Sequence, residues 1–458
     1  MIQTIRKAWA IPELKKKIMF TAAILLIFRI GNAITVPYID VMQLEAQLDS
    51  MGATILGLYN VMSGGAFATA TVFALSIQPY INSSIIIQLL TVAIPYLERL
   101  AKEGGEEGRK KIQSITRYTT VGIAVLQAVG YYMMMKRYAL LETGADGIWP
   151  ALVIIVTLIA GSSFVMWMGE QVTEFGVGNG ISIILFAGIL SRIPKMVSDM
   201  YQGMTRWSAI NNNTMSLETL TEAGYSAETA QQLLDTAIAP WAVALLVVGI
   251  LALIVFIVFI NDAERRIPVQ YAKRQVGRKM YGGQSSNLPM KVNMSGVLPV
   301  IFAQSIASLP ITVWSFIGVP AEGTVSRSFY DAIDTKSVLY MVVYFIMIIG
   351  FSYFYSSIQF NPVEIANNLK KQGGSIPGRR PGKPTVDFIK KVLNKITMFG
   401  AIYLGIVAIC PLIVGKFIGN NSVAIGGTSV IIVVGVALET VKALENQMLM
   451  RQYKGFLE

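Results

Sequence analysis

The chain of 458 residues contains no histidine and only one cysteine. Without histidine there can be no imidazole-based metal site, proton relay or histidine general base. The single cysteine, Cys410, excludes a disulfide framework. Charge is also scarce, because 14% of the residues are charged and 53% are hydrophobic, whereas soluble globular proteins are about 25% charged. This composition predicts a multi-pass membrane protein without a metal site or cofactor.

Apolar stretches predict an all-α integral membrane protein with ten transmembrane helices. The predicted spans are 18–36, 72–94, 119–135, 148–168, 180–193, 241–260, 296–317, 338–358, 396–417 and 428–441. A basic N-terminus precedes the first span, but no small-residue cleavage site follows it. We therefore expect an uncleaved first span instead of a signal peptide.

Lysine and arginine are distributed unevenly among the predicted loops. With the N-terminus inside, 29 of the 38 basic residues fall on the cytosolic side, which predicts cytosolic N- and C-termini by the positive-inside rule. Two cytosolic loops, 261–293 and 359–395, are long, basic and rich in glycine and proline. Such loops suit an acidic partner such as ribosomal RNA, or a docked protein. The alternative is that the basic residues of these loops only orient the neighbouring membrane spans and bind no partner.

The segment Leu56–Leu90 is 35 residues long and carries no charge. It is too long for one span of about twenty residues and too short for two. A Ser-Gly-Gly beginning at Ser63 and a Gln-Pro beginning at Gln78 interrupt it. Irregular backbone at membrane depth is tolerated only where protein or a water-filled cavity surrounds it. We therefore expect this segment to line a passage.

Sequence signals for an enzyme or a coupled transporter are weak. The stretch 378–385 lacks the spacing of a P-loop, and Gly176–Gly180 is not a dinucleotide fingerprint. Acidic residues are almost absent from the predicted spans, whereas ion-coupled transporters usually keep one at mid-membrane. We therefore expect a channel with an uncharged lining and not an enzyme. A secondary transporter of a small solute and a scaffold without a pore are the alternatives.

Long motifs throughout the chain resemble those of the SecY/Sec61-alpha family, the central channel subunits of protein translocases. The motifs are MSGGAFATATVFALSIQPYINSSIIIQLL at 62–90, TRY at 116–118, GVGNGISIILFAGI at 176–189, RRIPVQYAKR at 265–274, VNMSGVLPVIFAQSI at 292–306, NPVEIANNLKKQGGSIPGRRPG at 361–382 and GGTSVIIVV at 426–434. They occur in the family's order and cover nearly the whole chain. The outer loop after the fifth span departs from the family by being longer than a minimal member needs.

The resemblance implies an hourglass channel built from two pseudo-symmetric halves of five spans. The halves would be residues 1–195 and 241–458, joined by the extracytoplasmic loop 196–240. A half-helix at about 56–69 would be a plug on the outer side of the waist. Its residues would include Met62, Ser63, Gly64, Gly65 and Phe67. Each glycine would weaken a helix by about 1 kcal/mol, which suits a plug that must leave its seat. The alternative is a simple re-entrant kink.

Three sets of functional residues follow from matching these motifs to the family. Bulky aliphatic side chains would form a ring that narrows the waist: Ile77, Ile81, Leu185, Ile189, Ile301 and Ile432. A lateral gate of spans two, three, seven and eight would contain Ser84, Gln88, Gln127, Gln304 and Ser305. Cytosolic partners would dock on Arg265, Arg266, Lys273, Arg274, Arg379 and Arg380.

The residue types suit these roles. The pairs Ile77/Ile81 and Leu185/Ile189 are each four residues apart, so each pair shares one helix face. An apolar ring can close around a polypeptide of any sequence and dewet when the polypeptide leaves. A glutamine in hydrocarbon needs a partner, and an interhelical hydrogen bond of about 0.6–2 kcal/mol is weak enough to break when a signal helix binds. Ordinary helix packing is the alternative for every one of these residues.

The resemblance implies a protein-conducting channel in the bacterial cytoplasmic membrane. It would translocate unfolded secretory polypeptides and insert membrane proteins through the lateral gate. The implied partners are the SecE and SecG subunits, the SecA motor ATPase, the ribosome with its nascent chain, signal peptides and membrane lipids, but no DNA. Arg380 is the docking residue with the largest expected effect, because a rigid Arg-Pro-Gly turn presents its guanidinium at a fixed place.

Overall fold

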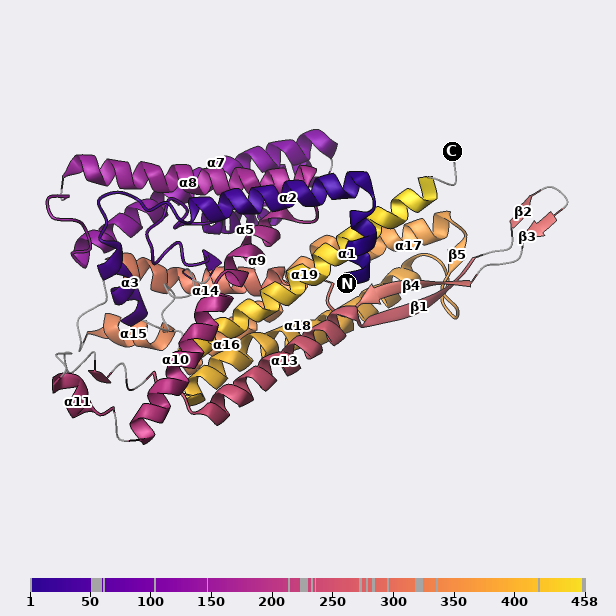
Figure 1. Cartoon of the computed structure of the whole chain (residues 1–458). Coiled ribbons are helices and arrows are strands. Elements are labelled where there is room, and N and C mark those ends of the chain that lie inside the picture. Colours follow the sequence, from indigo (N-terminus) through magenta and orange to yellow (C-terminus); the bar gives the residue numbers. More distant parts are fainter. Residues whose placement is uncertain are drawn as a thin grey trace.

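The structure is a computed structural model of the chain. It describes residues 2–50, 60, 62–102, 104–145, 147–212, 215–222, 230–231, 234, 236–271, 274–276, 279–281, 285–294, 296–317, 324–334, 337–418 and 421–454. The protein is mostly helical (Figure 1). The helices before residue 230 are α1 (Ile2–Trp9), α2 (Pro12–Gly31), α3 (Val41–Ser50), α5 (Gln78–Ala93), α6 (Pro95–Lys102), α7 (Gly105–Arg137), α8 (Ile148–Phe175), α9 (Gly180–Leu190), α10 (Ile193–Asn211) and α11 (Leu217–Glu222). The later helices are α13 (Pro240–Asp262), α14 (Leu298–Ile317), α15 (Val325–Ile333), α16 (Val338–Gln359), α17 (Pro362–Lys371), α18 (Lys383–Ile418) and α19 (Asn421–Lys454).

A helix occupies each of the ten stretches that the sequence predicts as spans. By length and composition, five stretches of the described chain could cross a membrane: Ile148–Phe175, Gly180–Asn211, Pro240–Asp262, Val338–Lys371 and Lys383–Val414. A sixth arises if α5 and α6, which are bent by 105° at Ile94, form one broken span. The protein is therefore a multi-pass membrane protein, while the number ten stays a prediction.

The second predicted span starts later than expected. Residues 63–77 form successive turns, and α5 begins only at Gln78. Ala70 and Ser76 adopt φ angles of 45° and 48°, which a helix cannot contain. Pro79 stands in the first turn of α5, where its missing N–H is not needed. The Gln-Pro pair therefore starts the helix instead of interrupting a span.

The fifth predicted span is longer than expected. The Asn179 side chain caps α9 by accepting hydrogen bonds from the N–H groups of Ile181 and Ser182. After α9 ends at Leu190, Pro194 lies in the first turn of α10, which continues to Asn211. The predicted extracytoplasmic loop 196–240 is thus helical in its first part. A short helix, α11, follows α10 in the same loop.

The two long basic loops contain strands, which the all-α expectation missed. The strands β1 (Glu264–Tyr271), β4 (Ser285–Lys291) and β5 (Gly374–Ser375) form one antiparallel sheet in the order β4-β1-β5. The short strands β2 (Arg274–Val276) and β3 (Lys279–Tyr281) pair with each other. Ile267 and Val269 of β1 are both buried, as alternation along a strand requires.

Sequence-distant parts of the two loops share one hydrophobic core. Ile267 and Val269 of the first loop pack in one cluster with Leu369, Ile376 and residues of α18 from the second. We call this unit, residues 264–291 and 362–396, the loop domain. Figure 1 shows it at the same end of the molecule as α1 and the C-terminal part of α19, while α3, α11 and α15 lie at the other end.

Candidate functional site: an apolar waist with a seated plug

The six predicted ring residues are all buried. Their exposed fractions are 0% for Ile77, 5% for Ile81, 2% for Leu185, 6% for Ile189, 5% for Ile301 and 2% for Ile432. All six belong to one hydrophobic cluster, which joins helices from both predicted halves. Helix α9 packs against α19, and α14 packs against α5. The tertiary fold therefore brings together residues that lie up to 355 positions apart in the sequence.

Glycines of α8 and α9 allow close approach to the ring and the plug. A methyl group added to Gly169 would lie 3.3 Å from Cδ1 of Ile77. One added to Gly188 would lie 2.7 Å from the carbonyl oxygen of Met62, which is too close. The spacing of the aliphatic residues gave no indication of these two glycines, although Gly188 directly precedes the predicted ring residue Ile189.

The predicted plug is described at Asn60 and from Met62 onward, and its remaining residues, 56–59 and 61, lie outside the described residues. From Ser63 to Thr69 the chain forms turns, so the expected half-helix is wrong for this part. Gly64 and Gly65 adopt φ angles of 73° and 96°. Only glycine takes up such angles without steric cost. The two glycines therefore form a turn and do not act by weakening a helix.

Local hydrogen bonds hold this turn together. The Asn60 carbonyl oxygen accepts from the N–H of Gly65 at 2.8 Å and from the Ser63 hydroxyl at 3.1 Å. The Asn60 side-chain oxygen accepts from the N–H of Ala68 at 3.0 Å. Ser63 Oγ in turn accepts from the N–H of Phe67 at 3.0 Å. The described plug is thus a self-contained turn of backbone and side-chain hydrogen bonds.

Side chains of the surrounding helices also bind the plug. Gln78 Nε2 donates to Met62 Sδ at 2.9 Å, and Met62 is buried. Tyr131 of α7 donates its hydroxyl hydrogen to the Phe67 carbonyl oxygen at 2.8 Å. Sequence reasoning did not identify Gln78 or Tyr131 as plug contacts, because a polar residue in a span does not reveal its distant partner.

The predicted gate residues lie on helices that meet. Helix α14 packs against α5, α7 and α16. Gln304 and Ser305 of α14 are buried, with exposed fractions of 7% and 8%, while Gln127 and Ser84 are half-buried. Gln88 Nε2 donates to Ser84 Oγ at 3.5 Å within α5, so the interhelical bond expected for Gln88 is replaced here by an intrahelical contact. The Gln88 side-chain oxygen is buried without a partner.

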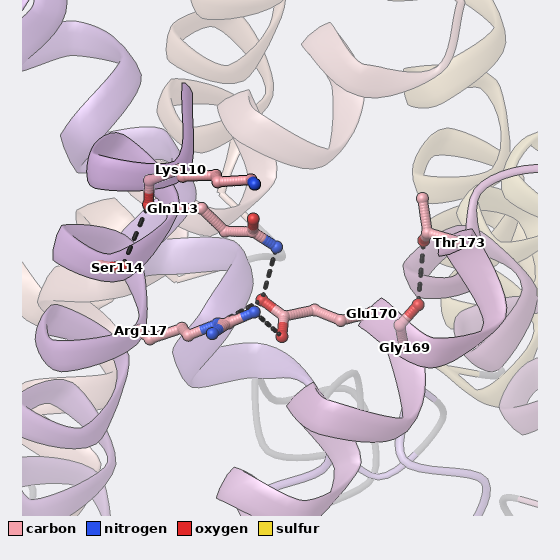
Figure 2. Close-up of polar contacts among 7 residues, drawn as sticks. All are labelled: Lys110, Gln113, Ser114, Arg117, Gly169, Glu170 and Thr173. Atoms are coloured by element: carbon pink, nitrogen blue, oxygen red, sulfur yellow. Dashed lines mark hydrogen bonds and ion pairs between the residues drawn. The ribbon is translucent and has the colours of Figure 1, made fainter. Parts of the chain in front are cut away.

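An ion pair joins α7 to α8 near one end of these helices (Figure 2). Arg117 contacts Glu170 through two nitrogens, with Nε 2.9 Å from Oε1 and Nη2 2.8 Å from Oε2. Gln113 donates a further hydrogen bond to Glu170 at 3.1 Å. Arg117 precedes the predicted third span, and its hydrogen bond to Glu170 raises its pKa above the ordinary arginine value. A bidentate pair of this kind fixes the relative position of two helices.

We expect Glu170→Gln to lower the free energy of unfolding by about 1 kcal/mol, because it removes the charge of this pair while Arg117 is half exposed to solvent. The measurement is thermal unfolding of the purified protein in detergent. Glu142→Gln, at an exposed glutamate beyond the end of α7, is the control and should leave the midpoint unchanged. Equal midpoints for wild type and Glu170→Gln would contradict the assignment.

The predicted docking residues belong to the loop domain. Arg265 and Arg266 of β1 are exposed, and Arg266 Nε lies 2.7 Å from Glu264 Oε1. Arg274 begins β2, and Lys273 lies outside the described residues. The Arg379 guanidinium lies 5.3 Å from the Phe388 ring centroid.

Arg380 is exposed in a rigid turn. Its carbonyl oxygen accepts a hydrogen bond from the Thr385 hydroxyl at 2.8 Å, and Thr385 itself is buried. Gly378 and Gly382 on either side adopt φ angles of 77° and 107°. The backbone is therefore held in place while the guanidinium faces solvent. A backbone held in this way would present the Arg380 side chain from a fixed position, as the sequence predicts.

Metal ligands do not gather anywhere in the part of the chain that the structure describes, where three or more His, Cys, Asp or Glu residues never come close enough to hold an ion. The described residues thus hold an apolar cluster at the predicted ring, a turn packed against it at the predicted plug, and an exposed set of arginines in the loop domain.

Comparison with known proteins identifies the family of this chain. The SecY family model matches residues 71–441. The chain is 42% identical to the protein translocase subunit SecY of Bacillus subtilis strain 168 over 463 residues, with 100% of both chains covered. It is 40% identical to the protein of the same name from Streptomyces scabiei over 469 residues, again with 100% of both covered.

Solved structures show the same fold at low sequence identity. A structure described as a protein conducting channel has a TM-score of 0.61 and 17% identity, and the match covers 95% of this chain and 92% of that one. Sec61 in a canine ribosome-channel complex from the endoplasmic reticulum has a TM-score of 0.58, 16% identity and the same coverage. The full-length relatives and the family model together establish that this chain belongs to the SecY family.

Proposed function

We propose that this protein is the channel subunit of a bacterial protein translocase, and that it moves unfolded secretory polypeptides across the cytoplasmic membrane. The observation that carries the proposal is the burial of all six ring residues in one apolar cluster shared by both halves. Such a waist makes no hydrogen bonds with a passing chain and so accepts any sequence. It also excludes water and ions when no chain is present.

The lateral gate is the route by which apolar helices would leave the channel for the lipid. Helices α5 and α7 meet α14 along this route, and their polar residues Gln88, Gln127 and Gln304 are half-buried or buried there. An arriving signal helix replaces weak contacts between these helices by apolar burial. Membrane proteins would be inserted by the same movement.

The loop domain is the proposed docking site for cytosolic partners. Its exposed arginines suit the acidic surface of a ribosome or of a motor ATPase such as SecA. One solved relative is Sec61 in a ribosome-channel complex, which supports a ribosome as a partner of this chain. SecE and SecG are the proposed partner subunits, the termini are proposed to be cytosolic, and the chain itself is proposed to have no enzymatic activity.

A stalled secretory chain provides the direct test. We expect cysteines placed one at a time at the six ring positions to cross-link to a chain arrested in transit, because the ring is the narrowest point of the path. Cys410 is replaced by serine first, since it is an exposed free cysteine. Ile86→Cys, on α5 with 41% of its side chain exposed, is the matched control. Equal cross-linking at Ile86 and at the ring would contradict the proposed path.

The alternative function is transport of a small solute. Uptake into lipid vesicles that contain the purified protein distinguishes the two functions. A channel for polypeptides requires a preprotein and an energy source before anything moves, whereas a transporter takes up its solute with this chain alone. Uptake of small solutes by vesicles that contain only this chain would favour the transporter.

A further inference from the structure

Side chains at three helix positions donate hydrogen bonds to the described part of the plug. Two of these bonds end on backbone carbonyl oxygens. Asn32, directly after α2, donates to Ser63 at 3.3 Å, and Tyr131 of α7 donates to Phe67 at 2.8 Å. The third bond runs from Gln78 to the Met62 sulfur at 2.9 Å. Ser191 Oγ lies 3.4 Å from the Gly64 carbonyl oxygen, but its hydroxyl hydrogen is donated to the Gly188 carbonyl at 2.7 Å.

The bond from Tyr131 has the strongest geometry of the three. At 2.8 Å it has the usual length of a hydroxyl hydrogen bond, whereas the 3.3 Å of the Asn32 bond is at the long end of the range. The thioether that Gln78 contacts is a weak acceptor. Tyr131 is fully buried, with 0% of its surface exposed. Its ring also packs edge to face against Phe67, with centroids 4.9 Å apart and an interplanar angle of 76°.

Backbone bonds hold the other end of the plug segment. The Val36 N–H donates to the Ala70 carbonyl at 2.8 Å, and the Val72 N–H donates to the Ile34 carbonyl at 2.9 Å. These bonds flank an isolated bridge between Thr35 and Thr71. The Thr71 N–H also donates to the Ala66 carbonyl at 3.0 Å, and the Ala70 N–H donates to the Phe67 carbonyl at 3.4 Å. The described part of the plug is therefore tied through its own backbone to the residues that the bridge anchors.

We infer that the Tyr131 hydroxyl is the latch that keeps the plug in its seat, with Asn32 as a weaker support. This inference rests on the proposed channel function and on the plug role that the family resemblance implies for this segment. The latch binds a backbone carbonyl, so its hydrogen bond does not depend on the plug's side chains. All three donors lie in the predicted first half, 1–195. We therefore expect the plug to remain on that half until an entering polypeptide displaces it.

The test is Tyr131→Phe in the channel complex as purified from membranes, reconstituted into planar lipid bilayers without preprotein. The variant keeps the ring that packs on Phe67 and removes only the donor, so the buried Phe67 carbonyl loses its shorter hydrogen bond and keeps the 3.4 Å bond from the Ala70 N–H. We expect the resting open fraction, measured as ion conductance, to rise about tenfold, which corresponds to about 1.4 kcal/mol. Tyr132→Phe, the neighbouring half-buried tyrosine on α7, is the control and should conduct like wild type.

A second measurement separates release of the plug from general loosening of α7. In a Cys410→Ser background, Met62→Cys and Gln78→Cys are added to Tyr131→Phe and joined by a short bis-maleimide. Cross-linking should return the conductance to the wild-type level, because it reattaches the plug without restoring the hydroxyl. A leak that persists after complete cross-linking would overturn the latch.

The remaining outcomes are also decisive. A resting conductance of Tyr131→Phe equal to that of wild type would overturn the inference. If Tyr131→Phe does not accumulate, Asn32→Ala is measured instead, with an expected rise of about threefold, and an unchanged conductance there would overturn the inference as well. Preprotein translocation by wild-type vesicles is measured in parallel. Its absence would count against the proposed function, whereas its presence together with a sealed Tyr131→Phe channel would count against the latch alone.

Discussion

Replacing Ile81 and Ile432 together by asparagine is expected to make the resting channel leak ions by about one to two orders of magnitude. Both side chains are buried in the apolar cluster at the waist, with exposed fractions of 5% and 2%. An amide placed there without a partner costs about 1–3 kcal/mol, and each 1.4 kcal/mol changes the balance between dry and hydrated states about tenfold. The measurement is ion conductance of reconstituted channels without preprotein.

The same substitutions should relax the selectivity for signal sequences. A closed state that is less stable needs less binding free energy from the signal helix to open. Preproteins with defective signal sequences should therefore be exported by the double variant and not by wild type. Ile86→Asn is the matched control, because Ile86 lies on the same helix α5 with its side chain 41% exposed. Unchanged leak together with unchanged selectivity in the double variant would contradict the proposed ring.

Reversing the charge of Arg380 to glutamate is expected to reduce export more than tenfold while the protein remains inserted and folded. The side chain faces solvent from a turn that Thr385 and two glycines hold in place, so its replacement leaves the core of the loop domain intact. An acidic partner would meet repulsion at the point where it now meets a guanidinium. The measurements are preprotein translocation into vesicles and thermal unfolding of the purified variant.

Lys391→Glu is the control for Arg380→Glu. Lys391 lies on α18 in the same loop domain and is exposed, so the substitution makes the same change in net charge away from the turn. It should leave translocation within about twofold of wild type. Normal secretion by Arg380→Glu, or an equal loss in both variants, would contradict a docking role for Arg380 itself.

Local properties of the sequence were sufficient to predict where the helices lie. A membrane span requires an uninterrupted apolar run, and each of the ten predicted stretches contains a helix. The prediction was wrong where backbone geometry overrides hydropathy. The turns before Gln78 contain no charge, yet Gly64, Gly65 and Ser76 adopt positive φ angles there, and an apolar composition does not distinguish such turns from a helix.

The loop domain shows a different limit of sequence reasoning. Basic charge indicated that both loops face an acidic partner, but it did not indicate that they fold together. The pairing of Gln270 with Ser375 joins strands that lie more than one hundred residues apart. Such pairing depends on shape and on hydrogen bonds between distant segments, and no local pattern records it.

The amino-acid sequence by itself determined the class of this protein and its family, because hydropathy and long motifs can be identified in the sequence without the fold. Only the tertiary structure decided which polar groups bind the predicted plug. Asn32 and Tyr131 belong to different parts of the predicted first half, and each donates to a backbone carbonyl of the plug. A carbonyl is present at every residue, so the sequence cannot mark the ones that are bound. Their selection depends on where the helices place their donors in space.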